Sequence, residues 1–292
     1  MKRKRPSLII LCCMLLLGML PWTASAQTPP ESVIYGGGPF YVGGTPTMDI
    51  LRQSGFTTVM LWTIHVNSNG DLVYNDHLVV SNGTYVGKTS WPSELATLKQ
   101  APTSVKRLEI SVGSWGVKDF ENIKNLVASQ GTGTSSMLYK NFSTLKSALG
   151  VDAISFDNED LYDVSSSVAF GNMLGNLGYK ITLCPYTNTS YWQSVKSQLG
   201  SYVDRIYLQV YDGGAGNNPA TWSSQLGMTV MPGLDSKTSS GGNTPSQVNS
   251  RMSSWKASAN INGGFIWYYD AILNNPSGRL CRSHQQCANA CK

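Results

Sequence analysis

The segment Val151-Asp-Ala-Ile-Ser-Phe-Asp-Asn-Glu159 places a short β-branched and aromatic run directly before a cluster of acidic and amide residues. Side chains alternate along a strand, so Ser155, Asp157 and Glu159 share one face. Phe156 points to the opposite face. Two carboxyl groups on the inner face of a sheet are costly unless they are paired or neutralised. The segment therefore predicts a strand whose end carries chemistry, or else an acidic loop that caps the next helix or faces solvent.

The same alternation of short strand and helix runs from end to end. Candidate strands are residues 33–35, 57–64, 107–112, 153–157, 180–184, 205–211, 229–231 and 264–268. Candidate helices are residues 48–53, 92–99, 117–129, 137–149, 165–177, 191–199, 220–225 and 245–256. Strict alternation favours parallel strands joined by right-handed crossovers, and eight units let the sheet close. We therefore expect an α/β fold, a (β/α)8 TIM barrel, with a doubly wound open sheet as the alternative.

The start of the chain is typical of a secretory signal peptide. Basic residues at positions 2–5 precede a short apolar run at 8–20, and Ala24-Ser-Ala26 supplies small residues before Gln27. The apolar run is too short to span a bilayer comfortably. We expect residues 1–26 to be removed, residues 27–280 to form a single barrel domain, and residues 281–292 to form a cysteine-containing tail. The protein is then secreted to the extracellular space.

Removal of the signal changes the charge balance. The formal net charge of +5 includes four basic residues at positions 2–5, so 5 − 4 leaves +1 on the remaining 266 residues (292 − 26). Such a chain carries no basic face for nucleic acid or for anionic lipid. We expect a monomer with a neutral substrate, no nucleic-acid partner and no membrane partner once the signal is gone.

Motifs of other enzyme classes are absent from the sequence. There is no GxSxG elbow, no P-loop and no HExxH, and the three histidines are scattered. Gly36-Gly-Gly38 follows the first candidate strand without the spacing of a dinucleotide fingerprint. We therefore expect no cofactor and no metal.

Cysteine count and compartment suggest disulfides. The cysteines that remain after signal removal are Cys184, Cys281, Cys287 and Cys291. An even number in an oxidising compartment favours disulfides, with three possible pairings. A zinc cluster of the tail cysteines with His284 is the alternative, which export disfavours.

Aromatic residues gather near the carboxyl ends of the candidate strands, where barrels build their active sites. They include Tyr35, Trp62, Trp115, Tyr211 and Trp267. Trp192 and Trp222 belong either to the groove above the strands or to the core. Residues 67–89 predict a polar hairpin, with strands at 71–74 and 78–80, that either walls a groove or decorates the surface.

The spacing of Asp157 and Glu159 constrains the chemistry. Two neighbouring carboxylates push one pKa upward, which keeps one group protonated and able to act as an acid. Along one strand they lie roughly 6.6 to 7 Å apart, which overlaps the separation in inverting glycosidases. Both would approach a sugar from the same side, however, so a substrate that supplies its own nucleophile fits better. An N-acetyl group does this while Glu159 protonates the leaving oxygen and Asp157 holds the amide N–H.

A family resemblance covers nearly the whole mature chain. Asp152-x-x-Ser155-x-Asp157-x-Glu159 resembles the DxxDxDxE signature on the fourth strand of glycoside hydrolase family 18, the chitinases and endo-β-N-acetylglucosaminidases. Four other segments resemble the family in the correct order. Ser111-Val-Gly113 resembles SxGG on the third strand, with Ser114 in place of the second glycine, and Leu183-Cys-Pro185-Tyr186 resembles the fifth strand of short plant-type chitinases. Gln209-Val-Tyr211-Asp212 resembles MxYD or QxY on the sixth strand. Gly263-Gly-Phe-Ile-Trp267 resembles GGxxxW on the eighth strand but is one spacer residue shorter.

The resemblance implies a retaining hydrolase that cleaves β-1,4 linkages after N-acetylglucosamine, in chitin or in a glycan core. Glu159 would be the acid/base, Asp157 would orient the acetamido group, and Tyr211 would donate to its carbonyl oxygen. Trp267 would form the floor under the sugar. The other substrate-binding candidates are Gln209, Asp212, Tyr35, Trp62 and Trp115. The implied partner is an oligo- or polysaccharide that contains N-acetylglucosamine.

Ser155 departs from the family pattern, which carries its middle aspartate there. That acid normally shares a proton with the third one, so its replacement puts full chitinase activity in doubt. The alternative is a non-catalytic, lectin-like relative that binds chito-oligosaccharides. Retention of Asp157, Glu159 and Tyr211 favours the enzyme. Chitin or N-glycan substrate and endo or exo action stay open.

Overall fold

Eight strands of the described residues form a closed parallel ring. The computed structural model describes residues 30–236, 242–274 and 289, so the expected signal peptide and the tail cysteines lie outside the described residues. The ring strands are β1 (Glu31–Gly36), β2 (Thr58–Val66), β6 (Arg107–Val112), β7 (Ala153–Phe156), β8 (Lys180–Leu183), β9 (Val203–Gln209), β10 (Met231–Asp235) and β11 (Gly263–Trp267). They follow the order β1-β11-β10-β9-β8-β7-β6-β2, and β1 also pairs with β2. The predicted (β/α)8 barrel is confirmed, and the open-sheet alternative is excluded.

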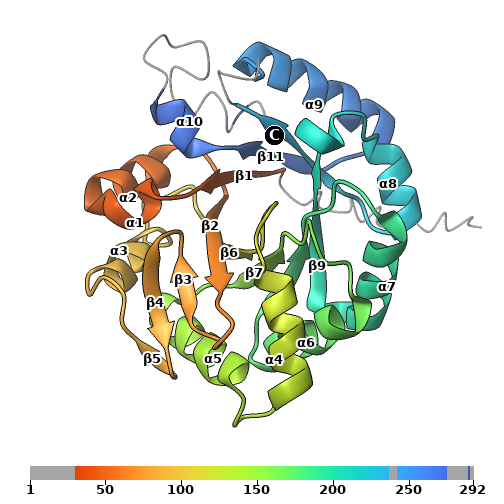
Figure 1. The fold of residues 1–292 in the computed structure, drawn as a ribbon. Coiled ribbons are helices and arrows are strands. Elements are labelled where there is room, and N and C mark those ends of the chain that lie inside the picture. Colours follow the sequence, from red (N-terminus) through yellow and green to blue (C-terminus); the bar gives the residue numbers. More distant parts are fainter. Residues whose placement is uncertain (1–29, 237–241, 275–288, 290–292) are drawn as a thin grey trace, which may run out of the picture.

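Helices surround the strands, as Figure 1 shows. They are α1 (Pro39–Val42), α2 (Gly44–Gln53), α3 (Trp91–Thr97), α4 (Asp119–Gln130), α5 (Met137–Leu149), α6 (Val164–Asn176), α7 (Thr189–Leu199), α8 (Pro219–Leu226), α9 (Pro245–Ala259) and α10 (Tyr269–Leu273), with 3₁₀ turns η1 (Gly200–Tyr202) and η2 (Asp212–Gly214). The longest one, α9, begins in a capping box in which Thr244 and Gln247 each accept from the other's backbone N–H. Such pairing satisfies two of the donors that a helix start leaves free.

The predicted hairpin is confirmed and extends the ring at β2. Its strands are β3 (Leu72–Tyr74), β4 (His77–Ser81) and β5 (Thr84–Tyr85), all antiparallel. The buried Tyr74 hydroxyl donates to the carbonyls of Gly36 and Gly37, which fastens the hairpin to the end of β1. The hairpin therefore packs on the outside of the barrel, at the lower left in Figure 1.

The prediction for β10 was wrong by two residues at its start and four at its end. Residues 229–231 were expected, whereas the strand runs from Met231 to Asp235 and includes Pro232 and Gly233. Proline and glycine usually interrupt strands, but Gly233 pairs in register with both Gln209 and Phe265. The Phe265 ring occupies the space where a Gly233 side chain would lie, so glycine is required here.

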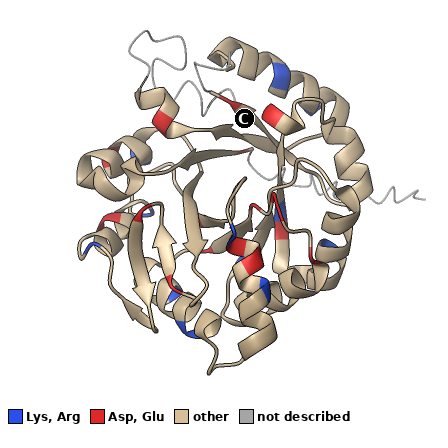
Figure 2. Cartoon of the chain, in the orientation of Figure 1, with Lys and Arg blue, Asp and Glu red and all other residues tan. Residues whose placement is uncertain are grey.

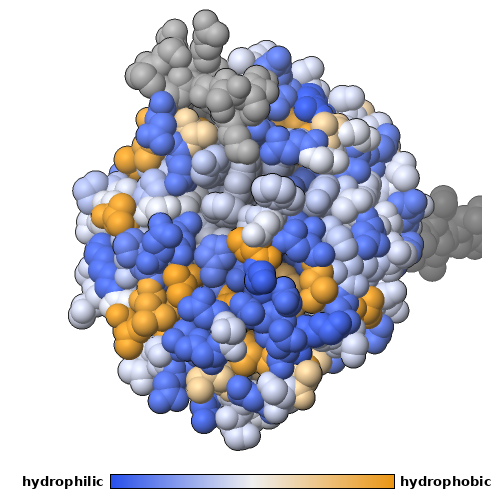
Figure 3. Space-filling view, in the orientation of Figure 1, coloured by the Kyte–Doolittle hydropathy of each residue, from blue (hydrophilic) through white to orange (hydrophobic). Residues whose placement is uncertain are grey.

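Apolar residues form two separate clusters. The larger one fills the layer between strands and helices, and it contains both Trp192 and Trp222, which therefore belong to the core. The smaller one lies inside the barrel and comprises Val33, Tyr35, Met60, Cys184, Tyr207, Met231 and Phe265. On the face shown in Figure 3, the remaining apolar residues form small groups between hydrophilic ones.

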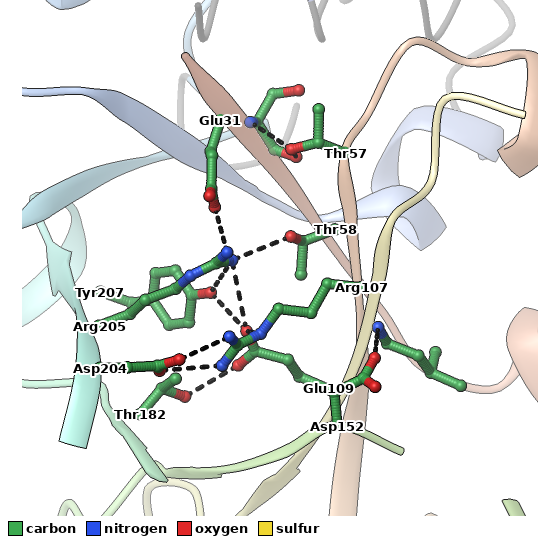
Figure 4. Close-up of polar contacts among 12 residues, drawn as sticks. Glu31, Thr57, Thr58, Arg107, Glu109, Asp152, Thr182, Asp204, Arg205 and Tyr207 are labelled. Carbon is green, nitrogen blue, oxygen red and sulfur yellow. Dashed lines mark hydrogen bonds and ion pairs between the residues drawn. The ribbon is translucent and has the colours of Figure 1, made fainter. Parts of the chain in front are cut away.

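The amino end of the barrel interior is closed by an ionic network (Figure 4). Glu109 is fully buried, and its carboxylate lies 2.6 Å from Arg107 Nε and 3.6 Å from an Arg205 amino group. Thr182 and Tyr207 donate hydroxyl hydrogen bonds to it over 2.9 and 2.8 Å. The other carboxylates of the network are Asp204, paired with Arg107, and Glu31, paired with Arg205. We call these five charged residues the basal network.

Candidate active site

A pocket of about 430 Å³ opens at the carboxyl ends of the strands, where this fold places its active sites. All nine site residues predicted from the sequence line it. They are Tyr35, Trp62, Trp115, Asp157, Glu159, Gln209, Tyr211, Asp212 and Trp267. Its size is that of a small-molecule site. The structure thus brings together residues from six of the eight ring strands or the loops that follow them.

The alternation of β7 continues past its last residue. Phe156 points outward and packs against Phe120 and Phe170 in the helical layer. Asp157 points inward and is 3% exposed. Gly113 has a φ of 98°, and a side chain there would collide with the Asp157 carbonyl. Glycine is therefore required directly after β6 for the acidic segment to come this close.

Asp157 and Glu159 are joined by one amide. Gln209 Nε2 lies 3.2 Å from Asp157 Oδ1 and 3.1 Å from Glu159 Oε1. The indole N–H of Trp62 donates to Asp157 Oδ2 over 3.2 Å. The charge of Glu159 raises the pKa of Asp157, so the two carboxyl groups interact electrostatically across this amide. Among the described residues, no lysine or arginine forms an ion pair with either acid.

This environment makes the pair hold a proton. Burial, and then the charge of Glu159, raise the pKa of Asp157 well above its usual range, while Trp62 and Cys184 act to lower it. Burial also raises the pKa of Glu159, with Asp160 and Asp212 adding to it, while Gln209 and Asp157 act in the opposite direction. Two close carboxyl groups in a desolvated site share one proton over a wide pH range.

The helix-cap interpretation of the acidic loop applies to a different residue. Asp163 is the N-cap of α6, and its side chain accepts from the Ser166 backbone N–H over 2.9 Å. Its hydrogen bonds with Ser166 and Lys124 lower the pKa of Asp163 to about 2. The cap is therefore supplied without Asp157 or Glu159, whose side chains remain in the pocket.

Aromatic rings form the wall beside the acids. The Trp267 ring lies nearly parallel to Tyr211, with ring centroids 6.3 Å apart, and edge-on to Trp62 at 4.6 Å. Burial raises the pKa of the Tyr211 hydroxyl well above its usual range, so it stays protonated and able to donate. Indole faces pack well on sugar C–H groups. The wall thus combines a flat apolar surface with a hydroxyl donor.

Other residues lie at the rim. Trp115 is 76% exposed, and Asp212 lies in η2 with a φ of 44°. Prediction missed Ser114, Tyr186 and Gly213, which also line the pocket. Tyr186 lies three residues after the end of β8 and packs over Gly213, so its position near a strand end was the signal that could have identified it.

The structure overturns the expectation that Cys184 forms a disulfide. Cys184 is a free, buried thiol just past the end of β8, and it lines the pocket. It belongs to the apolar cluster inside the barrel. Counting cysteines by compartment ignores which face of a strand each occupies. Cys281, Cys287 and Cys291 lie outside the described residues.

No protein-family model and no curated protein matches the sequence. Solved structures do match. The catalytic domain of a family 18 chitinase from the fern Peteris ryukyuensis is 19% identical, with a TM-score of 0.61 over 89% of this chain and 98% of that one. A family 18 chitinase from the chitin utilization locus of Flavobacterium johnsoniae is 11% identical, with a TM-score of 0.62 over 90% and 94%. This chain has the fold of the family 18 chitinases.

A third match includes a ligand. A double mutant of a family 18 chitinase from Cycas revoluta, in complex with (GlcNAc)4, is 11% identical, with a TM-score of 0.59 over 89% of this chain and 99% of that one. At these identities the likeness concerns the fold. Activity and substrate must be inferred from the pocket itself.

Two further findings concern partners. Lys and Arg residues are dispersed in the view of Figure 2 and form no continuous basic face there. Within residues 30–236 and 242–274, none of the helices has the length and apolar character needed to cross a membrane.

Proposed function

We propose that this protein is a retaining glycoside hydrolase that cleaves β-1,4 linkages after N-acetylglucosamine, in chitin or in a glycan core, outside the cell. The observation that carries the proposal is the proton-sharing pair of Asp157 and Glu159 in a pocket with an aromatic wall. Both acids enter from one side of the barrel, so a nucleophile from the substrate itself fits best. An acetamido group at C2 of the sugar provides one.

In the first step the acetamido oxygen attacks C1, and the bond from C1 to the leaving oxygen breaks. Glu159 gives its proton to that oxygen, so the leaving sugar departs as a neutral alcohol. The amide nitrogen becomes positively charged in the resulting oxazolinium ion, which the Asp157 carboxylate stabilises while accepting the N–H. Tyr211 orients the acetamido oxygen with its hydroxyl, and Trp267 supports the sugar ring.

In the second step water attacks C1 and Glu159 takes a proton from it. The oxazolinium ring opens, which restores the acetamido group and yields a product of retained configuration. Binding of substrate itself assigns the shared proton. An N–H that donates to Asp157 favours its charged form, so the proton moves to Glu159, where the first step needs it.

The test compares the mature protein with Glu159→Gln on chitin oligosaccharides and on a high-mannose glycoprotein. Loss of the acid is expected to lower kcat by about 10²- to 10⁴-fold. Nuclear magnetic resonance should show β-configured products from the wild type. Asp76→Asn, an exposed acid in the hairpin, is the control and should match the wild type.

Two results would contradict the proposal. Equal or absent hydrolysis by wild type and Glu159→Gln on both substrates would remove the enzymatic claim. If both then bind chito-oligosaccharides with similar affinity, the protein is a lectin-like binder. Products of inverted configuration would exclude acetamido participation.

A further inference from the structure

Ser155, the inward-facing residue that precedes Asp157 on β7, does not hydrogen-bond the Asp157 carboxylate. Ser155 precedes Asp157 on the inner face of β7, and its hydroxyl is buried with no hydrogen-bond partner among the described residues. The hydroxyl of Ser111, its neighbour in register on β6, is in the same condition. The groups that position Asp157 must therefore come from other strands.

Cys184 lies beside Asp157 on the next strand. Phe156 and Leu183 are register partners of β7 and β8, and the Cys184 backbone N–H donates to the Phe156 carbonyl over 2.9 Å. Asp157 is the first residue after β7 and Cys184 is the first residue after β8. The two residues therefore lie side by side, and both side chains point into the barrel. Cys184 also acts to lower the pKa of Asp157, which is the effect that a thiol donating to the carboxylate would have.

The thiol is itself held in a fixed direction. The Tyr35 hydroxyl donates to Cys184 Sγ over 3.6 Å, and Gln209 Nε2 lies 3.7 Å from the same atom. The Tyr35 hydroxyl is the donor in its contact with sulfur, so the one hydrogen on sulfur is left to point at the carboxylate. Burial raises the pKa of the Cys184 thiol well above its usual range, which keeps that hydrogen in place at neutral pH.

We infer that Cys184 is a positioning residue for the reaction, whose S–H, directed by Tyr35, donates to Asp157 and favours its charged form when the acetamido N–H is bound. The role rests on the proposed function, in which Asp157 must be charged to stabilise the oxazolinium ion. The thiol supplies from β8 the hydrogen bond that Ser155 does not supply from β7.

Three substitutions separate the hydrogen bond from packing. Cys184→Ala removes the donor and leaves a small cavity, Cys184→Val removes the donor but keeps the volume, and Cys184→Ser keeps a donor. Loss of the donor should lower kcat about tenfold with little change in KM. It should also move the acid limb of the pH profile of kcat to higher pH, because Asp157 then protonates more readily. Cys184→Ser should restore both properties.

A readout without turnover keeps this inference distinct from the proposed function. Carbon-13 NMR titration of the side-chain carboxyl groups, with Asp157→Asn for assignment, should give a higher Asp157 pKa in Cys184→Val than in the wild type. The infrared S–H band present in the wild type and absent from Cys184→Ser should shift to higher frequency in Asp157→Asn, where the acceptor is weaker.

The outcomes divide cleanly. An unchanged Asp157 pKa and an unchanged acid limb in both donor-free variants would overturn the inference, whatever their stability. So would a Cys184→Ser protein as impaired as Cys184→Val. If the wild type hydrolyses neither substrate but its Asp157 pKa still depends on the thiol, the proposed function fails while the hydrogen bond stands.

Discussion

The two ends of the barrel interior treat buried carboxylates in opposite ways. At the amino end, Glu109 is surrounded by Arg107, Arg205 and two hydroxyl donors. At the carboxyl end, Asp157 is almost as buried but receives hydrogen bonds only from neutral groups, and its nearest charge is a second acid. One end compensates its negative charge, and the other leaves it uncompensated.

The compensated end stabilises the fold, whereas the uncompensated end has the properties of a reactive site. At the basal network, burial lowers the pKa of Arg107, but the Glu109 and Asp204 carboxylates outweigh this effect and raise the net pKa, so the Arg107 guanidinium stays charged. At the pocket, burial and the charge of Glu159 raise the pKa of Asp157 well above its usual range, so its protonated form is favoured. Perturbed acids of this kind cluster at functional sites, whereas paired ones fix structure.

The largest stability effect is expected at the basal network. Glu109→Gln keeps the shape of the side chain but removes the charge between Arg107 and Arg205. We expect the free energy of unfolding to fall by about 3 kcal/mol, the lower end for a broken buried pair, because each arginine keeps a second carboxylate. Urea denaturation measures it, and kcat per folded molecule should stay unchanged.

Glu121→Gln is the matched control. Glu121 faces Lys118 across 4.0 Å with 54% of its side chain exposed, so the loss should be below about 1 kcal/mol. Equal losses in the two variants would show that the basal network contributes no more than a surface pair. A fall in kcat for Glu109→Gln would show that the two ends of the barrel are not independent.

The sequence could predict what depends on local pattern. Residues 107–112 and 137–149 have the predicted bounds, and alternation along β7 placed both acids on the inner face. The basal network could not be predicted, since Arg107 and Asp204 are 97 positions apart and meet only through barrel closure. The role of Cys184 was missed because it depends on its register beside Asp157, which composition does not reveal.

At the pocket, removing a buried charge is expected to raise the free energy of unfolding, by less than Glu109→Gln lowers it. The folded-state pKa of Asp157 is raised, so folding favours its protonated form, and stability is lost as the pH rises above the unfolded carboxyl pKa of about 3.9. Asp157→Asn removes this penalty. At pH 7 the variant should be more stable than the wild type by about 0.5 to 2 kcal/mol, while its activity is lost.

The pH dependence supplies the control for Asp157→Asn. Urea denaturation of both proteins at several pH values should show the difference shrinking as the pH falls towards the unfolded carboxyl pKa. A variant that is less stable than the wild type at pH 7 would mean that the neutral donors around Asp157 compensate its charge fully. The contrast between the two ends would then disappear.

The smallest change in the free energy of unfolding is expected for a substitution at Ser155, which lies between the two ends of the barrel. Its hydroxyl is buried without a partner among the described residues, so Ser155→Ala removes a polar group that gains nothing from folding. The free energy of unfolding should change by less than about 1 kcal/mol, towards greater stability. The acid limb of the pH profile should stay where it is in the wild type, in contrast to Cys184→Val. A shift of that limb in Ser155→Ala would show that Ser155 on β7 affects the ionisation of Asp157. Ser155 would then be part of the catalytic end of the barrel.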